Sequence, residues 1–178
     1  MVYLIRTTPP NKVFSESFDR RVRACFESII GSPTNDISWL QCTLSSRFGG
    51  MGLRMTQTHC SAGFIASYLI YKNSIANSSV HPLLETASKI YKTKSNQEIP
   101  DSTVIEQKKL SEDIDRKTFT YIFERLDDQG KAHLLSASGD FATAWTTLLP
   151  SPSWLMKKVE FITASKFLLG MKLYALNA

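Results

Sequence analysis

Apolar residues recur at the spacing of an α-helix along most of this chain, and no segment sustains the alternation typical of a half-buried strand. The clearest example runs from Phe14 to Ile29, with apolar residues mostly three or four positions apart on one face. Cys25 belongs to this face and is expected in the core. Gly31 and Pro33 follow and are typical of a helix end. The pattern predicts an all-α fold, an irregular bundle of about seven to nine short helices.

The length of 178 residues is enough for one domain with a substantial core. We predict a single helical domain over residues 1–178, in which residues 1–91 hold the first helices and a glycine-rich turn. Residues 92–101 are polar and are predicted to form a loop. Residues 102–178 hold the C-terminal helices, with an expected break near Asp115.

Three of the eight glycines, Gly49, Gly50 and Gly52, lie within four residues and are flanked by Arg47 and Arg54. Glycine permits backbone conformations that other residues disfavour, and glycines before a helix can form a phosphate site. A long helix is predicted to begin just after this stretch. The spacing fits neither the P-loop nor the dinucleotide-binding fingerprint, and no β-branched apolar strand precedes it. A packing turn is therefore favoured, and a nucleotide-binding loop is the alternative.

The chain carries a formal net charge of +5, with its two ends positive and its middle near neutral. This balance permits a nucleic-acid or phosphate partner without requiring one. The best candidates for phosphate contacts are five arginines: Arg20, Arg21, Arg23, Arg47 and Arg54. They would share one surface if the first amphipathic helix packs near the glycine turn. A solvated helix face is the alternative interpretation.

No pattern in the sequence predicts a catalytic, metal or cofactor site. Asp127-Asp128 is an acidic pair of the kind that a polymerase metal site uses, but it lies between helical patterns, and Asp127 is better placed to cap a helix. His59 is adjacent to Cys60, and adjacent residues on a helix point apart, which argues against a catalytic dyad. We therefore expect this chain not to be an enzyme, with no cofactor and no bound metal.

The cysteine and hydropathy patterns point to the inside of a cell. The three cysteines Cys25, Cys42 and Cys60 are an odd number at long spacings, which is typical of reduced thiols in the cytoplasm or nucleus. No apolar run reaches the roughly 18 residues that a membrane span needs, so no membrane partner is expected. The N-terminus lacks the basic and apolar regions of a signal peptide.

The order of several motifs is more informative than any one of them. The glycine turn reads Leu44-Ser45-Ser46-Arg47-Phe48-Gly49-Gly50-Met51-Gly52-Leu53-Arg54, and downstream stand Ala132-His133-Leu134-Leu135-Ser136-Ala137-Ser138-Gly139, Ala144-Trp145 and Leu149-Pro150. This order resembles the region after the polymerase palm in reverse-transcriptase-like proteins of non-long-terminal-repeat retrotransposons. Those proteins read L-P-x-R-x-G-G-L-G-L-R, R-A-R-L-L-S-x-S-G and A-W-L-x-x-x-P. The chain departs from them with Ser45 for Pro, Met51 for Leu, and Lys131 and His133 for Arg.

The resemblance covers nearly the whole chain and implies a non-catalytic, thumb- or connector-like region. Such a region would pack against a polymerase palm domain and contact the phosphate backbone of an RNA or DNA duplex. The palm with its catalytic aspartates would then precede Met1. Two rival hypotheses are a helical protein-interaction module with an exposed apolar patch, and an inert gene fragment that folds only in part.

Overall fold

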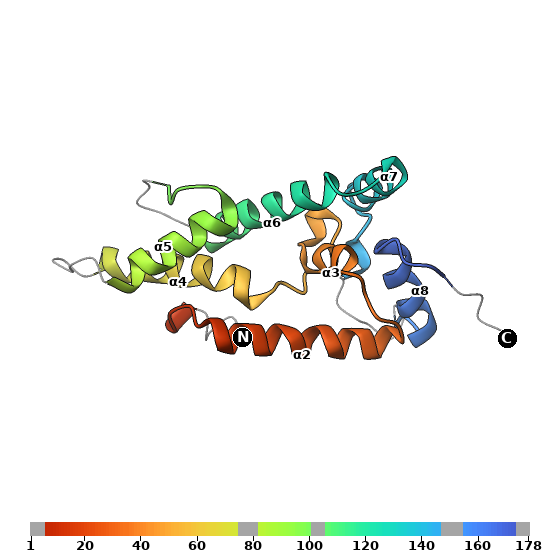
Figure 1. Cartoon of the computed structure of the whole chain (residues 1–178), viewed down its shortest axis with the longest axis horizontal. Helices are drawn as coiled ribbons and strands as arrows, with labels where there is room; N and C mark the ends of the chain where they lie inside the picture. Colours follow the sequence, from red (N-terminus) through yellow and green to blue (C-terminus); the bar gives the residue numbers. More distant parts are fainter. Residues whose placement is uncertain (1–5, 75–81, 101–105, 147–154, 174–178) are drawn as a thin grey trace. The chain divides into compact units, whose positions relative to one another are not determined.

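The computed structural model describes residues 6–74, 82–100, 106–146 and 155–173 (Figure 1). Over these residues the chain forms seven α-helices and two short 3-10 helices, and no strand. The helices are α2 (Lys12–Ile30), α3 (Asp36–Thr43), η1 (Ser46–Phe48), α4 (Thr56–Ser74), α5 (Pro82–Ser95), α6 (Gln107–Phe123), α7 (Asp128–Ala137), η2 (Ala144–Thr146) and α8 (Lys158–Leu168). The all-α prediction is confirmed, and the seven α-helices lie at the low end of the predicted number. The Leu149-Pro150 motif lies outside the described residues.

The chain divides into two compact units, each built from two separate stretches of sequence. Residues 1–20 and 55–118 form the first unit, and residues 21–54 and 119–178 form the second. The chain passes between the units at three points, and two of these points fall inside helices, because α2 and α6 each contribute one part to either unit. The third point lies between Arg54 and Met55, just before α4. The prediction of a single domain, which rests on chain length, stays a prediction.

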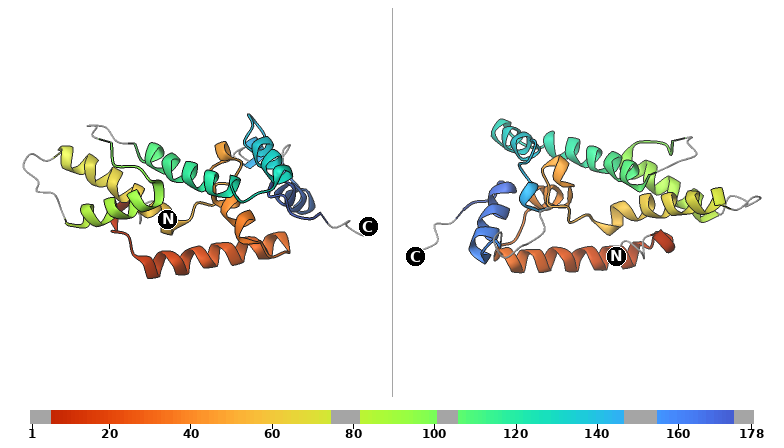
Figure 2. Two further views of the ribbon diagram at one scale, coloured as in Figure 1. Left: turned by 45° about the horizontal axis from the view of Figure 1, so that its top comes forward. Right: turned by 180° about the vertical axis from the view of Figure 1, so that it is seen from behind.

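Helices α4, α5 and the first part of α6 provide the core of the first unit. Small residues on α4, among them Ala62 and Ala66, are buried with Ile65 and permit close helix packing. The Tyr91 hydroxyl of α5 donates a hydrogen bond to Asp113 Oδ2 of α6 at 2.8 Å. Figures 1 and 2 show α5 and α6 running in the same direction, opposite to α4. The core is therefore apolar, and a hydrogen bond between two side chains connects α5 to α6.

Helix α6 runs without interruption through Asp115, so the predicted break there is wrong. Asp115 is 1% exposed, and its Oδ1 atom lies 3.4 Å from Nε2 of His59 in α4. An aspartate is seldom buried unless it has a partner. Because this partner is distant in the sequence, the neighbouring residues could not reveal it.

Helix α5 extends to Ser95, so residues 92–95 of the predicted 92–101 loop are helical. Ser95 is buried within the first unit and follows Tyr91 by four positions on the buried face of α5. The helix stops at Asn96, whose φ of 61° is left-handed, a conformation that asparagine tolerates at helix ends. Lys117 Nζ of α6 donates to Asn96 Oδ1 at 2.6 Å, which places a cation at the C-terminal end of α5.

The buried face of α2 differs from the predicted apolar stripe. Its buried residues are Ser15, Asp19, Phe26 and Ile30. Cys25 is exposed, so its predicted place in the core is wrong. Cys25 precedes Phe26 directly and therefore points about 100° away from it around the helix. Asp19 takes a place on the buried face because its carboxylate forms hydrogen bonds there, which hydrophobicity alone could not predict.

Candidate functional site

The glycine turn is a corner whose N–H groups are used within the chain. Gly49 and Gly52 have left-handed φ angles of 75° and 74°, which favour glycine. A Cβ on Gly50 would lie 2.1 Å from the Leu44 carbonyl oxygen, so a larger residue does not fit there. The Gly52 N–H donates to the Leu44 carbonyl at 2.8 Å, and the Gly50 N–H donates to the Ser45 carbonyl at 3.2 Å. Because these donors are occupied, the geometry supports a packing turn over a nucleotide-binding loop.

In the second unit, the same turn packs against α7, and Gln41 of α3 connects it to the end of α8. A Cβ on Gly49 would lie 3.1 Å from backbone and Cβ atoms of Ala137 in α7. Gln41 Nε2 of α3 donates to the Gly49 carbonyl at 3.1 Å and to the Leu168 carbonyl of α8 at 2.8 Å. The turn is therefore a structural joint between α3, α7 and α8.

The carboxylate of Asp19 fills the N-terminus of α4, the place where an anion would bind. Asp19 Oδ1 accepts a hydrogen bond from the Thr56 N–H at 2.7 Å, and Oδ2 accepts one from the Gln57 N–H at 2.9 Å. A helix N-terminus favours negative charge, and this residue of α2 supplies it from within the first unit. A phosphate bound here would have to displace a buried carboxylate. An aspartate on the inner face of an amphipathic helix is the sequence feature that signals such a contact.

Arg23 is part of the packing of the second unit. Its guanidinium pairs with Glu27 Oε1 and Asp36 Oδ1, each at 3.1 Å. It also donates to the Thr34 carbonyl at 2.5 Å and lies 5.7 Å from the centre of the Trp39 ring. Hydrogen bonds from the Thr34 hydroxyl and N–H hold the pKa of Glu27 below its usual value. Arg23 therefore joins α2 to the start of α3, which makes it a poor candidate for a phosphate contact.

The other four candidate arginines are exposed. Arg20 and Arg21 lie on α2, Arg47 lies in η1, and Arg54 lies just before α4. Arg20 belongs to the first unit and the other three belong to the second. The five candidates thus come from three places in the chain, which are α2, η1 and the segment just before α4.

The surroundings of Arg20 and Arg21 are distinctive, because the acidic side chains of α2 all bind elsewhere. These side chains are Glu16, Asp19 and Glu27. Among the residues that the structure describes, no carboxylate pairs with Arg20 or Arg21. As far as the described residues go, both guanidiniums therefore keep a positive charge at the surface that no carboxylate neutralises.

Sequence reasoning missed a buried pair formed by His59 of α4 and Asp115 of α6. Their side chains are 7% and 2% exposed, with 3.4 Å between His59 Nε2 and Asp115 Oδ1. His59 Nδ1 is also buried, and no described residue forms a hydrogen bond with it. Cys60 Sγ donates to the Gln57 carbonyl at 3.7 Å. Burial of both His59 and Asp115 favours a structural tie between α4 and α6.

The acidic pair Asp127-Asp128 serves the N-terminus of α7. Asp127 Oδ1 accepts a hydrogen bond from the Gly130 N–H at 2.8 Å, which confirms the helix-cap interpretation. Asp128 pairs with Lys131 at 3.7 Å on the surface. In the described ranges, no three or more histidine, cysteine, aspartate or glutamate side chains are grouped to hold a metal ion. None of the helices in those ranges combines the length and apolarity needed to cross a membrane.

Comparisons with protein-family models, with curated proteins and with solved structures found no match to this chain. The resemblance to retrotransposon reverse transcriptases therefore rests on the sequence motifs and stays a prediction. The structure distinguishes the three candidates on α2. Arg20 and Arg21 are exposed without a described carboxylate partner, whereas Arg23 pairs with Glu27 and Asp36.

Proposed function

We propose that this chain is a non-catalytic, thumb- or connector-like helical region of the reverse-transcriptase type that contacts the phosphates of a nucleic-acid duplex. The order of the motifs supports the family, and the net charge of +5 supports an anionic partner. The exposed arginines Arg20 and Arg21 are the main contacts, with Arg47 and Arg54 as further candidates. An RNA or DNA backbone is the partner, and base-specific contacts are not part of the proposal.

The observation that carries this proposal is the charge left on α2. Its three carboxylates are bound elsewhere, so nothing described neutralises Arg20 or Arg21. Consecutive helix positions diverge by about 100°, so these two side chains reach different phosphates rather than sharing one. Arginine suits phosphate because its planar donors can bind two oxygens at once.

Fluorescence anisotropy tests this proposal with labelled RNA–DNA duplex, DNA duplex and single-stranded DNA at low salt. We expect saturable duplex binding, and a loss of roughly tenfold or more in affinity for the Arg20→Ala/Arg21→Ala variant. The matched control is Lys108→Ala/Lys109→Ala, which removes the same charge from two exposed neighbours on α6. Equal losses in the two variants would mean that only net charge matters, and would contradict an arginine site.

A second candidate function is docking onto a protein, for which the polymerase palm is the partner that the resemblance implies. Leu155, Met156 and Val159 support it, because these three apolar side chains lie close in sequence and are 67%, 42% and 50% exposed. Calorimetric titration with a purified palm domain of such a reverse transcriptase is the test. Replacing all three residues with serine should abolish binding without lowering the helix content, and undiminished binding would contradict this candidate.

The remaining alternative is an inert fragment that folds only in part. A cooperative thermal transition in circular dichroism is expected for a folded functional region and not for such a fragment. This measurement therefore precedes both binding experiments.

A further inference from the structure

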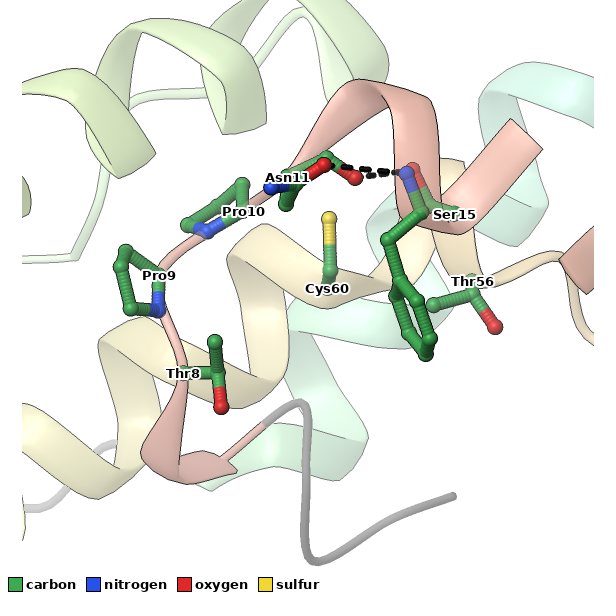
Figure 3. Close-up of a pocket in the computed structure, with 8 residues that line it drawn as sticks. Thr8, Pro9, Pro10, Asn11, Ser15, Thr56 and Cys60 are labelled. Atoms are coloured by element: carbon green, nitrogen blue, oxygen red, sulfur yellow. Dashed lines mark hydrogen bonds between the residues drawn. The ribbon is translucent and has the colours of Figure 1, made fainter. Parts of the chain in front are cut away.

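Two neighbouring pockets of the first unit meet at Cys60 of α4. Their volumes are about 300 and 310 Å³, and Pro10 and Cys60 line both. Figure 3 shows the segment from Pro9 to Asn11 passing over α4, with the Cys60 sulfur pointing toward it. Each volume is at the lower end of the range for small-molecule sites in proteins.

The first pocket presents mainly apolar surface to an occupant. Pro9, Pro10 and Phe14 contribute apolar rings, and a proline has no N–H to offer. Ser15 also lines it, but its hydroxyl donates to the Asn11 carbonyl at 2.8 Å and is therefore used within the chain. This pocket suits the apolar body of a ligand.

Cys60 contributes a neutral thiol to the wall. Burial raises the pKa of Cys60, and its Sγ donates to the Gln57 carbonyl at 3.7 Å. A thiol with a raised pKa is a weak nucleophile, so Cys60 is a packing surface for a ligand rather than a point of attachment.

The second pocket adds positive charge to the same place. Lys12 and Lys94 line it beside the apolar side chain of Ile90. Lys12 pairs with Glu16 at 3.8 Å. Within the part of the chain that the structure describes, Lys94 has no carboxylate partner. Lys94 is half-buried, which strengthens its attraction for an anion relative to a fully solvated lysine.

We propose that the two pockets form one binding site for a small amphipathic anion. Its apolar body packs against Pro10, Phe14 and Cys60, and its anionic group pairs with the Lys94 ammonium. Binding is non-covalent, and the site is independent of the arginines proposed to contact phosphates.

Two fluorescent probes that differ by one anionic group test this proposal on the full chain. Anilinonaphthalene sulfonate carries an apolar body and a sulfonate, whereas N-phenylnaphthylamine lacks the sulfonate. We expect saturable binding of the sulfonate probe, weakened roughly tenfold by Lys94→Met, while the neutral probe changes less than about twofold. Lys89→Met on the same helix is the matched control and should leave both affinities unchanged. Equal weakening by both lysine variants, or no saturable binding, would overturn the proposal.

Two further measurements locate the site. Phe14→Ala should weaken both probes, and the variant is expected to fold because Phe14 is 48% exposed. Cys60 is buried and its pKa is raised, so maleimide is expected to modify it slowly. In a Cys25→Ser background, saturating sulfonate probe should slow this modification further, as followed by mass spectrometry over hours. Cys42 is fully buried and serves as the internal unreactive reference. An unchanged modification rate at Cys60 would contradict the location of the site.

Discussion

Asp19 is the side chain through which α2 stabilises the start of α4. Replacing it with alanine leaves the N–H groups of Thr56 and Gln57 without their acceptor, which should lower the free energy of unfolding by about 2 kcal/mol. Asp19→Asn keeps one acceptor oxygen and should cost less. Urea unfolding followed by circular dichroism measures both effects. Equal stability of the wild type and Asp19→Ala would contradict the capping role.

Glu27 should make stability depend on pH in a defined direction. Hydrogen bonds from Thr34 lower its pKa in the folded state below the unfolded value near 4.5. Its stabilising contribution is therefore complete above the unfolded-state pKa and is lost as the pH falls through the folded-state pKa. Glu27→Gln removes this titration, so the difference in unfolding free energy between wild type and variant should shrink from about pH 6 to about pH 3.

Urea unfolding at a series of pH values measures this difference. The matched control is Glu124→Gln, an exposed glutamate for which no such narrowing is expected. A gap between wild type and Glu27→Gln that stays constant, or widens on acidification, would rule out the assigned role of Glu27.

Two alanine substitutions in the glycine turn, at Gly50 and at Gly52, should lower the stability of the protein by unequal amounts. Gly50→Ala would place its Cβ 2.1 Å from a backbone oxygen of Leu44, so we expect a loss of more than about 3 kcal/mol or failure to fold. Gly52 has a left-handed φ of 74° but no neighbour within 4 Å of the Cβ, so alanine should cost about 1 kcal/mol. Thermal melts compare the two variants. Similar losses in both would contradict the packing of this turn.

The presence of helices was predictable from the sequence. Their buried faces and their ends were predictable only where they depend on contacts between residues close in the sequence. Apolar spacing identifies α2, yet it misplaces Cys25, because a hydrogen-bonded Asp19 takes part of the buried face. The same spacing runs on through α6, but Asp115 suggests a break until its partner His59 is known. Partners such as these lie far away in the sequence. An aspartate on an inner helix face indicates that a partner exists, but no local pattern identifies that partner.

At the scale of the whole molecule, α2 and α6 both run through the two compact units. We therefore predict that the units unfold together. Trp39 and Trp145 belong to the second unit, so in a Trp154→Phe variant the tryptophan fluorescence reports that unit, whereas far-ultraviolet circular dichroism reports both units. Coincident urea transitions by the two methods are expected. Separate midpoints would show that the units unfold independently.

The sequence predicts which arginines could form the candidate site. It does not predict which of them remain free of partners within the fold and can therefore bind a phosphate. Net charge and arginine clusters are visible in the sequence, and they select Arg20, Arg21 and Arg23 equally. Only the fold shows that Arg23 is held by Asp36 of the next helix. In the same fold the three carboxylates of α2 bind elsewhere, which is why Arg20 and Arg21 carry the proposed function.

The salt dependence of duplex binding is the most direct test of the proposed contacts of Arg20 and Arg21 with phosphates. Each phosphate contact that is lost should reduce the slope of log affinity against log salt concentration by about one. We predict a slope smaller by about two for Arg20→Ala/Arg21→Ala than for the wild type, and an unchanged slope for Lys108→Ala/Lys109→Ala. No duplex binding by the wild type at low salt, or equal slopes for the wild type and the arginine variant, would contradict the proposed function.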